Sequence, residues 1–208
     1  MEKNYEALNL TQPESEHDPF TEDRYRQFHK YLPTNTRSVL DIGCNTGRGG
    51  RVLKGLNSAL KIYGLDAVRD RLDRLPQGIY EAGVHGYSTK IPNDDGTYDA
   101  VLAGEFIEHI YQADVDQTLG EIFRVLKIGG RLLLTTPNPG DIKRKFRGRS
   151  ILGGAHVSQH FPDTLTLKLR MAGFSRVRIY GSGKVSRYVG SHMPLSLYGS
   201  YLAMGDKF

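Results

Sequence analysis

Residues 39–50 read VLDIGCNTGRGG, an apolar run that enters a glycine-rich turn. The apolar run predicts a buried strand over 38–42, and the residues after the turn predict a helix over 48–56. Glycine allows a sharp turn and the close approach of a ligand, and the first turn of a helix offers unpaired N–H groups to an anion. The segment therefore predicts a strand, a turn and a helix that together bind an anionic group.

The glycine spacing in this turn excludes two common phosphate-binding motifs. The dinucleotide fingerprint G-x-G-x-x-G needs a glycine where Asn45 or Val52 stands, and no Gly-Lys-Ser/Thr follows to make a P-loop. The turn instead suits a smaller anion, such as an amino-acid carboxylate. Asp41 precedes the turn and can receive an ammonium group, directly or through water. A carboxylate and an ammonium group together form the methionine end of S-adenosylmethionine.

A second acid, Asp66, fits the same ligand. It follows a predicted strand over 60–65 and stands 23 residues after Gly43. An acid about 20 residues beyond a glycine turn commonly binds ribose hydroxyls. The alternative is that Asp66 caps the helix predicted over 69–75. The turn and the acid at this spacing favour the ribose role.

The rest of the chain alternates between strand and helix patterns, which predicts βαβ units and right-handed crossovers. We expect a doubly wound, mostly parallel α/β fold. A leader with one helix would occupy residues 1–34, and a single catalytic domain would occupy 35–208. The further predicted strands are 79–84, 98–103, 131–135, 175–180 and 200–204, and the further predicted helices are 21–31, 114–126 and 162–172.

Composition is typical of a globular protein in the cytoplasm. Hydrophobic residues make up 38% of the 208 residues and charged residues 25%. No apolar run is long enough to cross a bilayer, and the first residues lack the pattern of a secretory signal. Cys44 is the single cysteine, so no disulfide forms within the chain.

Five motifs in order make the chain resemble the class I S-adenosylmethionine-dependent methyltransferases. They are VLDIGCNTG, YGLDAV, DAVLA followed by EFIEH, LKIGGRLLLTTPNP, and the late pattern His156…Phe161-Pro162…Ala172-Gly173-Phe174. The match covers about residues 35–180. It implies a Rossmann-like, seven-stranded sheet and S-adenosylmethionine as the cofactor.

The resemblance also implies contacts for individual residues. In one position the chain departs from the family pattern, because Tyr87 stands where many members carry an acid that binds the adenine amino group. The resemblance assigns Asp41, Gly43, Cys44 and Gly47 to the methionine half of the cofactor, Asp66 and Ala67 to the ribose, Ser88 to the adenine edge, and Gly104 to the neighbourhood of the sulfur.

Acids and histidines follow the fourth predicted strand. Glu105, Glu108 and His109 are spaced to lie together if the segment is helical, and His156 or His160 can join them from a long loop. Such a set suits magnesium, manganese or zinc, and it resembles two metal-using subfamilies that methylate a quinone precursor or the terminal ribose of small RNAs. Many methyltransferases carry Glu-His here without a metal. In that case, His109 or His156 is the candidate general base, or either one is structural.

The acceptor is the least specified part of the reaction. The chain carries a formal charge of +5, and residues 143–149 hold five cations in seven positions. This basic segment can bind a phosphate or RNA, or it can be a solvated loop. We expect a hydroxyl on a sugar or phosphate-bearing metabolite, and the alternative is the 2′-hydroxyl of RNA.

Two other classes of protein share parts of this pattern. A nicotinamide-dependent oxidoreductase has the same strand, turn and acid, but it needs the dinucleotide fingerprint that this chain lacks. A non-catalytic adaptor would be expected to have a damaged glycine turn or to lack the ribose acid, and both are intact here.

Overall fold

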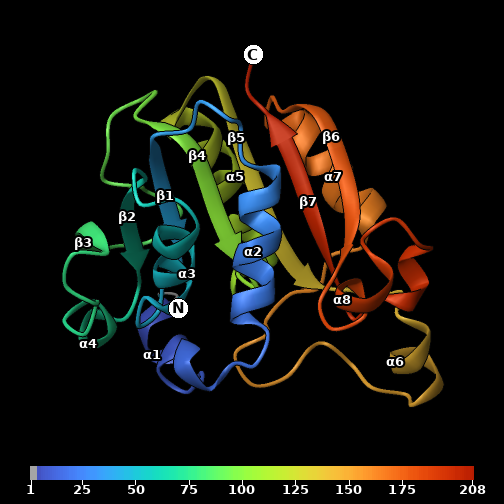
Figure 1. Ribbon diagram of the computed structural model, residues 1–208. Coiled ribbons are helices and arrows are strands. Elements are labelled where there is room, and N and C mark those ends of the chain that lie inside the picture. The colour runs from blue at the N-terminus through green and yellow to red at the C-terminus, as the bar shows by residue number, and fades with distance from the viewer. Residues whose placement is uncertain (1–3) are drawn as a thin grey trace.

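The computed structural model describes residues 4–208, which fold around one seven-stranded sheet (Figure 1). The strand order is β3-β2-β1-β4-β5-β7-β6, and β7 runs antiparallel to both of its neighbours, β5 and β6. The predicted doubly wound, mostly parallel seven-stranded sheet is therefore confirmed. The strands are β1 (Ser38–Ile42), β2 (Lys61–Asp66), β3 (Tyr80–His85), β4 (Tyr98–Gly104), β5 (Leu126–Pro137), β6 (Ser175–Ser182) and β7 (Ser200–Asp206).

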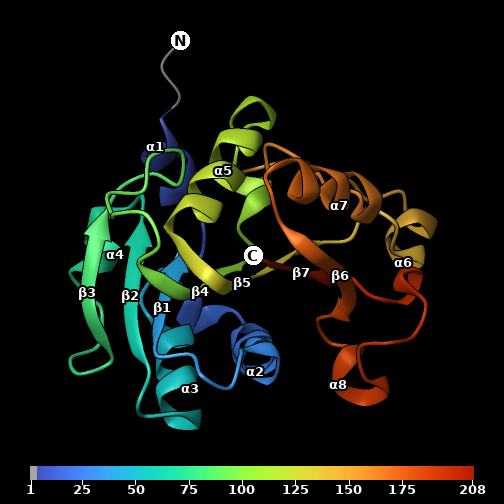
Figure 2. The same ribbon diagram turned by 90° about the horizontal axis from the view of Figure 1, so that it is seen from above.

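Helices cover both faces of the sheet (Figure 2). One face carries α5 (Val115–Val125) and α7 (Pro162–Met171), and the other carries α2 (Thr21–Tyr31) and α3 (Arg48–Leu56). The bounds of β1 and α3 are those predicted from the sequence, because each element carries its own pattern of apolar residues. The helix α2 ends at Tyr31 as predicted, but Thr21, the predicted N-cap, is its first residue and Phe20 is the N-cap. No helix within residues 4–208 is long and apolar enough to cross a membrane.

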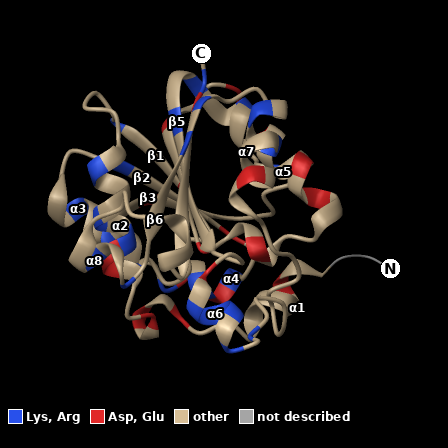
Figure 3. Cartoon of the chain, turned by 90° about the vertical axis from the view of Figure 1, so that its right-hand side faces the viewer, with Lys and Arg blue, Asp and Glu red and all other residues tan. Residues whose placement is uncertain are grey.

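Some elements differ from the sequence prediction. The strand β5 begins at Leu126, five residues before the predicted start, because Leu126 pairs with Tyr98 ahead of an irregularity in the ladder. The helix α4 (Arg69–Leu72) is shorter than predicted. The loop between β5 and α7 contains the short helix α6 (Ile142–Phe146), and the loop between β6 and β7 contains the short helix α8 (Ser186–Val189). The lysines and arginines of α6 appear blue in Figure 3.

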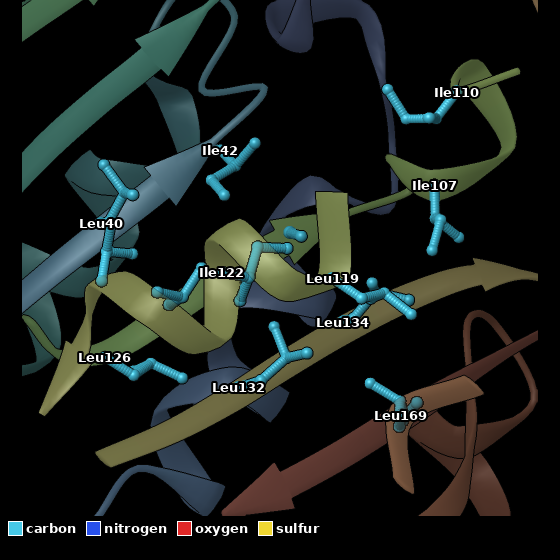
Figure 4. Close-up of a cluster of buried hydrophobic side chains, with 14 of the residues drawn as sticks. Leu40, Ile42, Ile107, Ile110, Leu119, Ile122, Leu126, Leu132, Leu134 and Leu169 are labelled. Carbon is cyan, nitrogen blue, oxygen red and sulfur yellow. The ribbon is translucent and has the colours of Figure 1, made fainter. Parts of the chain in front are cut away.

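The core forms two layers because neighbouring residues of a strand face opposite sides of the sheet. On one side, Leu40 and Ile42 of β1 pack in a cluster with Leu119 and Ile122 of α5 (Figure 4). On the other side, Val39 packs in a cluster that contains Tyr25 and Phe28 of α2 and Leu53 of α3. Asp41 alternates with Leu40 and Ile42, so its side chain enters the second layer, where it meets Tyr25.

The strand order reverses between β1 and β4. From β1 the chain continues outward to β2 and β3, whereas from β4 it continues to β5 on the other side. Ile42 pairs with Ala103, so the ends of the two strands, Gly43 and Gly104, lie side by side. Open α/β sheets bind their ligands in the crevice at such a point.

The N-terminal segment folds back over this crevice. It contains α1 (Tyr5–Leu10) and a single 3-10 turn (Ser15–His17), and Tyr5 is buried in the first core layer. Residues 1–3 of the predicted leader lie outside the described residues. The boundary between residues 34 and 35 stays a prediction. The described part of the predicted leader packs against the domain, since Tyr5 lies in its core.

Candidate functional site

A cavity of about 220 Å³ lies at the carboxyl ends of β1, β2 and β4. We call it the strand-end cavity. Two of the residues assigned to the cofactor by resemblance, Asp41 and Gly47, are absent from its lining. The other six line it, namely Gly43, Cys44, Asp66, Ala67, Ser88 and Gly104.

The glycine turn is held by its own backbone hydrogen bonds. The N–H groups of Gly43 and Cys44 donate to Leu65 O at 2.7 and 3.3 Å, and the N–H of Gly47 donates to Cys44 O at 3.0 Å. Gly43 has φ +69° and Gly47 has φ +85°, conformations that favour glycine. These three N–H groups are therefore already paired within the protein, and the binding of a carboxylate by the N–H groups at the start of α3 stays a prediction.

Gly47 is required for packing. A Cβ atom at this position would lie 2.6 Å from Pro76 Cδ and 2.9 Å from Leu75 Cδ2, distances that side chains do not tolerate. The glycine thus lets the start of α3 approach the chain after α4. A direct contact with the cofactor stays a prediction for Gly47.

Asp41 is fully buried between two tyrosines. Its Oδ1 accepts a hydrogen bond from the Tyr25 hydroxyl at 2.6 Å, and its Oδ2 accepts one from the Tyr80 hydroxyl at 2.7 Å. Burial raises the pKa of Asp41 to about 6, and this effect outweighs the two hydrogen bonds. The carboxylate ties α2 and β3 to β1, and a contact with the cofactor's ammonium group stays a prediction.

Asp66 is positioned as an acceptor at the end of β2. Its Oδ2 accepts from the N–H of Asn45 at 2.9 Å and its Oδ1 accepts from the N–H of Val68 at 2.9 Å. Burial raises the pKa of Asp66 above its ordinary value. Each carboxylate oxygen can accept a further hydrogen bond, so two hydroxyl groups of a ligand can be bound. The alternative helix-cap role is not observed, because the N-cap of α4 is Val68.

The far end of the strand-end cavity is aromatic. The rings of Tyr5 and Tyr87 have centroids 5.9 Å apart, and both residues line the cavity together with Ser88. The Ser88 hydroxyl is hydrogen-bonded to that of Thr118 at 3.1 Å, inside the protein. Ring surfaces therefore line this end of the cavity, and a flat base can pack against them.

Sequence reasoning missed the residues that bring the N-terminal segment over the cavity. Arg71 is buried, and its Nη2 donates to Asn9 O at 2.8 Å and Gln12 O at 2.9 Å. The Asn45 side chain accepts from the N–H of Ser15 at 3.0 Å. No local pattern marks these contacts, since each joins residues at least 30 positions apart.

Arg24 is a further residue that the sequence did not indicate. It lies over the end of β4, and a Cβ at Gly104 would be 2.8 Å from its Cδ. Its Nη1 lies 3.0 Å from Asp18 Oδ2, and its Nε lies 3.9 Å from Glu105 Oε1. Arg24 and Arg71 are the permanent cations that line the strand-end cavity.

Three of the four metal candidates meet in space. Ligand atoms of Glu108, His109 and His156 lie within 4.8 Å of one another. Glu105 does not belong to this group. It precedes the 3-10 turn Ile107–His109 with φ +48°, and its Oε2 accepts from the Ser200 hydroxyl at 3.2 Å. A single 3-10 turn, instead of an α-helix, directs Glu105 and Glu108 to different partners.

The hydrogen bonds of the two histidines decide their tautomers. His109 Nδ1 lies 3.1 Å from Ala155 O, and His156 Nδ1 lies 3.1 Å from Ile151 O. A carbonyl oxygen only accepts, so each Nδ1 carries a proton, and in the neutral form of either ring Nε2 is the nitrogen with the lone pair. Burial first, and then the neighbouring His156, lower the pKa of His109 to about 4. His109 is therefore neutral at neutral pH.

Glu108 and His160 differ in their surroundings. Glu108 is fully buried, its Oε2 accepts from the Thr136 hydroxyl at 2.9 Å, and its Oε1 has no hydrogen-bond partner among the described residues. Burial and the nearby Glu105 raise its pKa well above the ordinary range.

His160 instead bonds to the Ser158 hydroxyl at 2.8 Å within the core and belongs to no such cluster. Of the two loop histidines, the structure brings His156 to the site.

Comparisons with known proteins indicate the family and the fold. Residues 40–134 match the family model described as a methyltransferase domain. A probable S-adenosylmethionine-dependent methyltransferase of Mycolicibacterium smegmatis is 34% identical over 109 residues, a match that covers 49% of this chain and 38% of that protein. The chain thus spans well under half the length of this relative. A demethylmenaquinone methyltransferase of Deinococcus radiodurans is 28% identical over 187 residues, covering 76% of this chain and 77% of that protein.

A solved structure confirms the fold. The crystal structure of a SAM-dependent methyltransferase from Archaeoglobus fulgidus superposes with a TM-score of 0.70 and 21% sequence identity, covering 89% of this chain and 92% of the other.

Proposed function

We propose that the chain is a class I S-adenosylmethionine-dependent methyltransferase and that it transfers the methyl group of this cofactor to a hydroxyl oxygen of a small molecule. One observation carries the proposal. Asp66 keeps one free acceptor position on each carboxylate oxygen in the cavity that Gly43 and Gly104 also line. The two hydroxyls of a ribose match these two positions.

The remaining parts of the cofactor have partners in the same cavity. The adenine would pack against Tyr5 and Tyr87, and the methionine half would extend past Gly43 towards Gly104, since all four residues line the cavity. The N–H groups of Gly43, Cys44 and Gly47 are paired, so Arg24 is the group we assign to the methionine carboxylate. The sulfonium would then lie near Glu105 and His109, where the acceptor would approach.

A titration distinguishes this proposal from a nicotinamide-dependent enzyme. We expect calorimetry to show binding of S-adenosylmethionine and S-adenosylhomocysteine, and none of NAD. Arg24→Gln should weaken S-adenosylmethionine more than adenosine, which has no carboxylate. Binding of NAD in place of S-adenosylmethionine would refute the proposal.

Methyl transfer makes modest demands on the protein. The acceptor oxygen attacks the methyl carbon in line, the C–O bond forms as the S–C bond breaks, and S-adenosylhomocysteine leaves with both electrons of that bond. The protein must mainly orient the acceptor and accommodate the hydroxyl proton. His109 or His156 can accept that proton through its free Nε2, although the lowered pKa makes His109 a weak base.

We propose a divalent cation as a second component of this site. Glu108, His109 and His156 would hold it. The Nδ1 protons of the two histidines are bonded to carbonyl oxygens, as is usual for metal-bound histidines, which leaves each Nε2 to face the cluster. Glu108 Oε1 is buried and has no hydrogen-bond partner within residues 4–208. A cation bound there would lower the pKa of a coordinated acceptor hydroxyl.

Metal binding can be measured without turnover. Titration with Mn²⁺, followed by electron paramagnetic resonance, should show binding to the wild type and loss of binding in the Glu108→Gln, His156→Ala double variant. His192→Ala, a histidine away from the cluster, is the control and should bind as the wild type does. Absence of Mn²⁺ binding, together with full activity after chelation, would refute the cation site and leave a histidine as the group that accepts the hydroxyl proton.

The comparisons support a small acceptor. The relative from D. radiodurans is named for demethylmenaquinone, which is a small molecule, and this favours a metabolite over the 2′-hydroxyl of RNA. We also propose a reducing, cytoplasmic location, because the single cysteine, Cys44, is a buried free thiol beside the turn.

A further inference from the structure

A second cavity of about 610 Å³ adjoins the first, and we call it the basic cavity. Arg24, Glu105 and His156 line both cavities and form the wall between them. The basic cavity therefore opens towards the point where the methyl group is expected.

Two distant segments supply cations to this cavity. Lys143, Arg144, Arg147 and Arg149 come from α6 and the residues after it, and Lys184 comes from the loop between β6 and α8. Figure 3 shows the blue residues of α6. The charge is regional as well, because residues 142–205 contain eleven lysines and arginines and a single acid, Asp163.

These cations are not neutralised inside the protein. None of the five forms an ion pair within residues 4–208, and the buried Nε of Arg144 has no hydrogen-bond partner there. The two acids that line the cavity are engaged elsewhere. Asp141 accepts from the N–H of Lys143 at 3.1 Å at the start of α6, and Glu105 faces Arg24 and Ser200.

A basic loop without a binding role would not need cations from two segments around one cavity. The repulsion among five such cations is unfavourable, and their combined positive potential attracts an anion. Lys145 supports the distinction, because it belongs to the same helix and carries the same charge but does not line the cavity.

We propose that the basic cavity binds a phosphate group of the methyl acceptor. The inference rests on the proposed function and adds the chemical class of the substrate. Arg144, Arg147 and Lys184 hold the phosphate by charge-assisted hydrogen bonds. The rest of the acceptor extends past His156, so that its hydroxyl reaches the sulfonium. The phosphate can belong to a soluble phosphomonoester or to a lipid headgroup. Phe146 is 93% exposed and Ile142 55% exposed on α6, and these side chains could contact lipid.

The first test measures inorganic pyrophosphate binding by calorimetry. The Arg144→Gln, Arg147→Gln, Lys184→Gln triple variant should lose at least about tenfold in affinity, since three charged contacts are removed. Lys145→Gln, the matched control on the same helix, should stay within about twofold of the wild type. Equal losses in the two variants, or no pyrophosphate binding to the wild type, would overturn the proposal.

Binding of S-adenosylhomocysteine to the same variants separates this inference from the proposed function. We expect the triple variant to bind S-adenosylhomocysteine as the wild type does, since the three residues lie outside the strand-end cavity. Failure of the wild type to bind S-adenosylhomocysteine refutes the proposed function, whatever the pyrophosphate result. Normal binding of S-adenosylhomocysteine without a selective loss of pyrophosphate refutes only the phosphate site.

Three further probes identify the source of the phosphate. Competition of pyrophosphate by ribose 5-phosphate supports a soluble phosphomonoester. Binding to phosphatidylglycerol vesicles but not to phosphatidylcholine vesicles, lost in the triple variant and weakened by Phe146→Ser, supports a lipid headgroup. Binding to a short RNA that falls equally in Lys145→Gln and in the triple variant reports a general basic surface and contradicts the cavity site.

Discussion

The strand-end cavity and the basic cavity share a wall but are built in opposite ways. In the strand-end cavity, polar groups are already paired with the protein. Asp66 accepts from two backbone N–H groups, and the glycine turn is bonded to Leu65. In the basic cavity, five cations have no ion-pair partner within residues 4–208.

This difference indicates different roles in ligand binding for the strand ends and for the loops. Groups held by a buried sheet stay in place when a ligand arrives, which suits a cofactor of constant structure. Cations on surface loops present charge without a fixed geometry, which suits an acceptor that differs among related proteins. The predictions below test this comparison, beginning with the largest effect expected.

Gly49→Ala tests whether the strand-end cavity depends on tight packing. A Cβ at Gly49 would lie 2.1 Å from Cζ of Tyr25, so α2 and α3 must separate, and we expect a loss of about 3 kcal/mol in the free energy of unfolding. Gly55→Ala on the same helix has open space and should instead stabilise by about 0.5–1 kcal/mol. Urea denaturation measures both, and equal effects would show that the α2–α3 contact is not tight.

Asp66→Asn tests the cofactor side directly. The amide has an NH2 donor in place of one acceptor oxygen, so it cannot accept both the backbone N–H and the ligand hydroxyl on that side, and we expect S-adenosylmethionine binding to weaken by roughly 30-fold, about 2 kcal/mol. Asp70→Asn changes an exposed acid on α4 and is the matched control. Calorimetry distinguishes them, and unchanged affinity in Asp66→Asn would remove the ribose assignment.

Asp41→Asn tests whether this acid belongs to the packing. The pKa of Asp41 is about 6 in the folded protein against an ordinary value of 3.8. Between these values the folded state holds a proton that the unfolded state has released, so stability falls as pH rises from about 4 to 6. Asparagine removes this loss, and we expect the variant to gain on the order of 2 kcal/mol over the wild type across that range. Parallel stability curves for the two proteins would contradict this.

The smallest effect expected is that of salt on the cofactor. Between 0.05 and 0.5 M salt, the affinity for S-adenosylmethionine should change by less than about threefold, because its partners are buried and poorly screened. Pyrophosphate binding should weaken far more over the same range, because the cations of α6 are exposed. Equal salt dependence in calorimetric titrations would remove the distinction between the two cavities.

Local features of the chain could be predicted well. The apolar run before Gly43 and the pattern after it predicted the bounds of β1 and α3, since each pattern lies within one element. The position of Asp66 at the end of β2 likewise followed from the chain alone. The partners of Asp41 could not be predicted, because Tyr25 and Tyr80, which donate hydrogen bonds to its carboxylate, come from distant elements that only the folded chain brings to β1.

The sequence by itself determined the order of strands and helices, the glycine turn and the acid at the end of β2, because these depend on neighbouring residues. Only the tertiary structure decided that Arg24 faces Glu105, that Glu108, His109 and His156 meet, and that Lys184 joins the cations of α6. Those groupings unite residues that are far apart in the chain, and their positions depend on how the whole sheet and its loops pack.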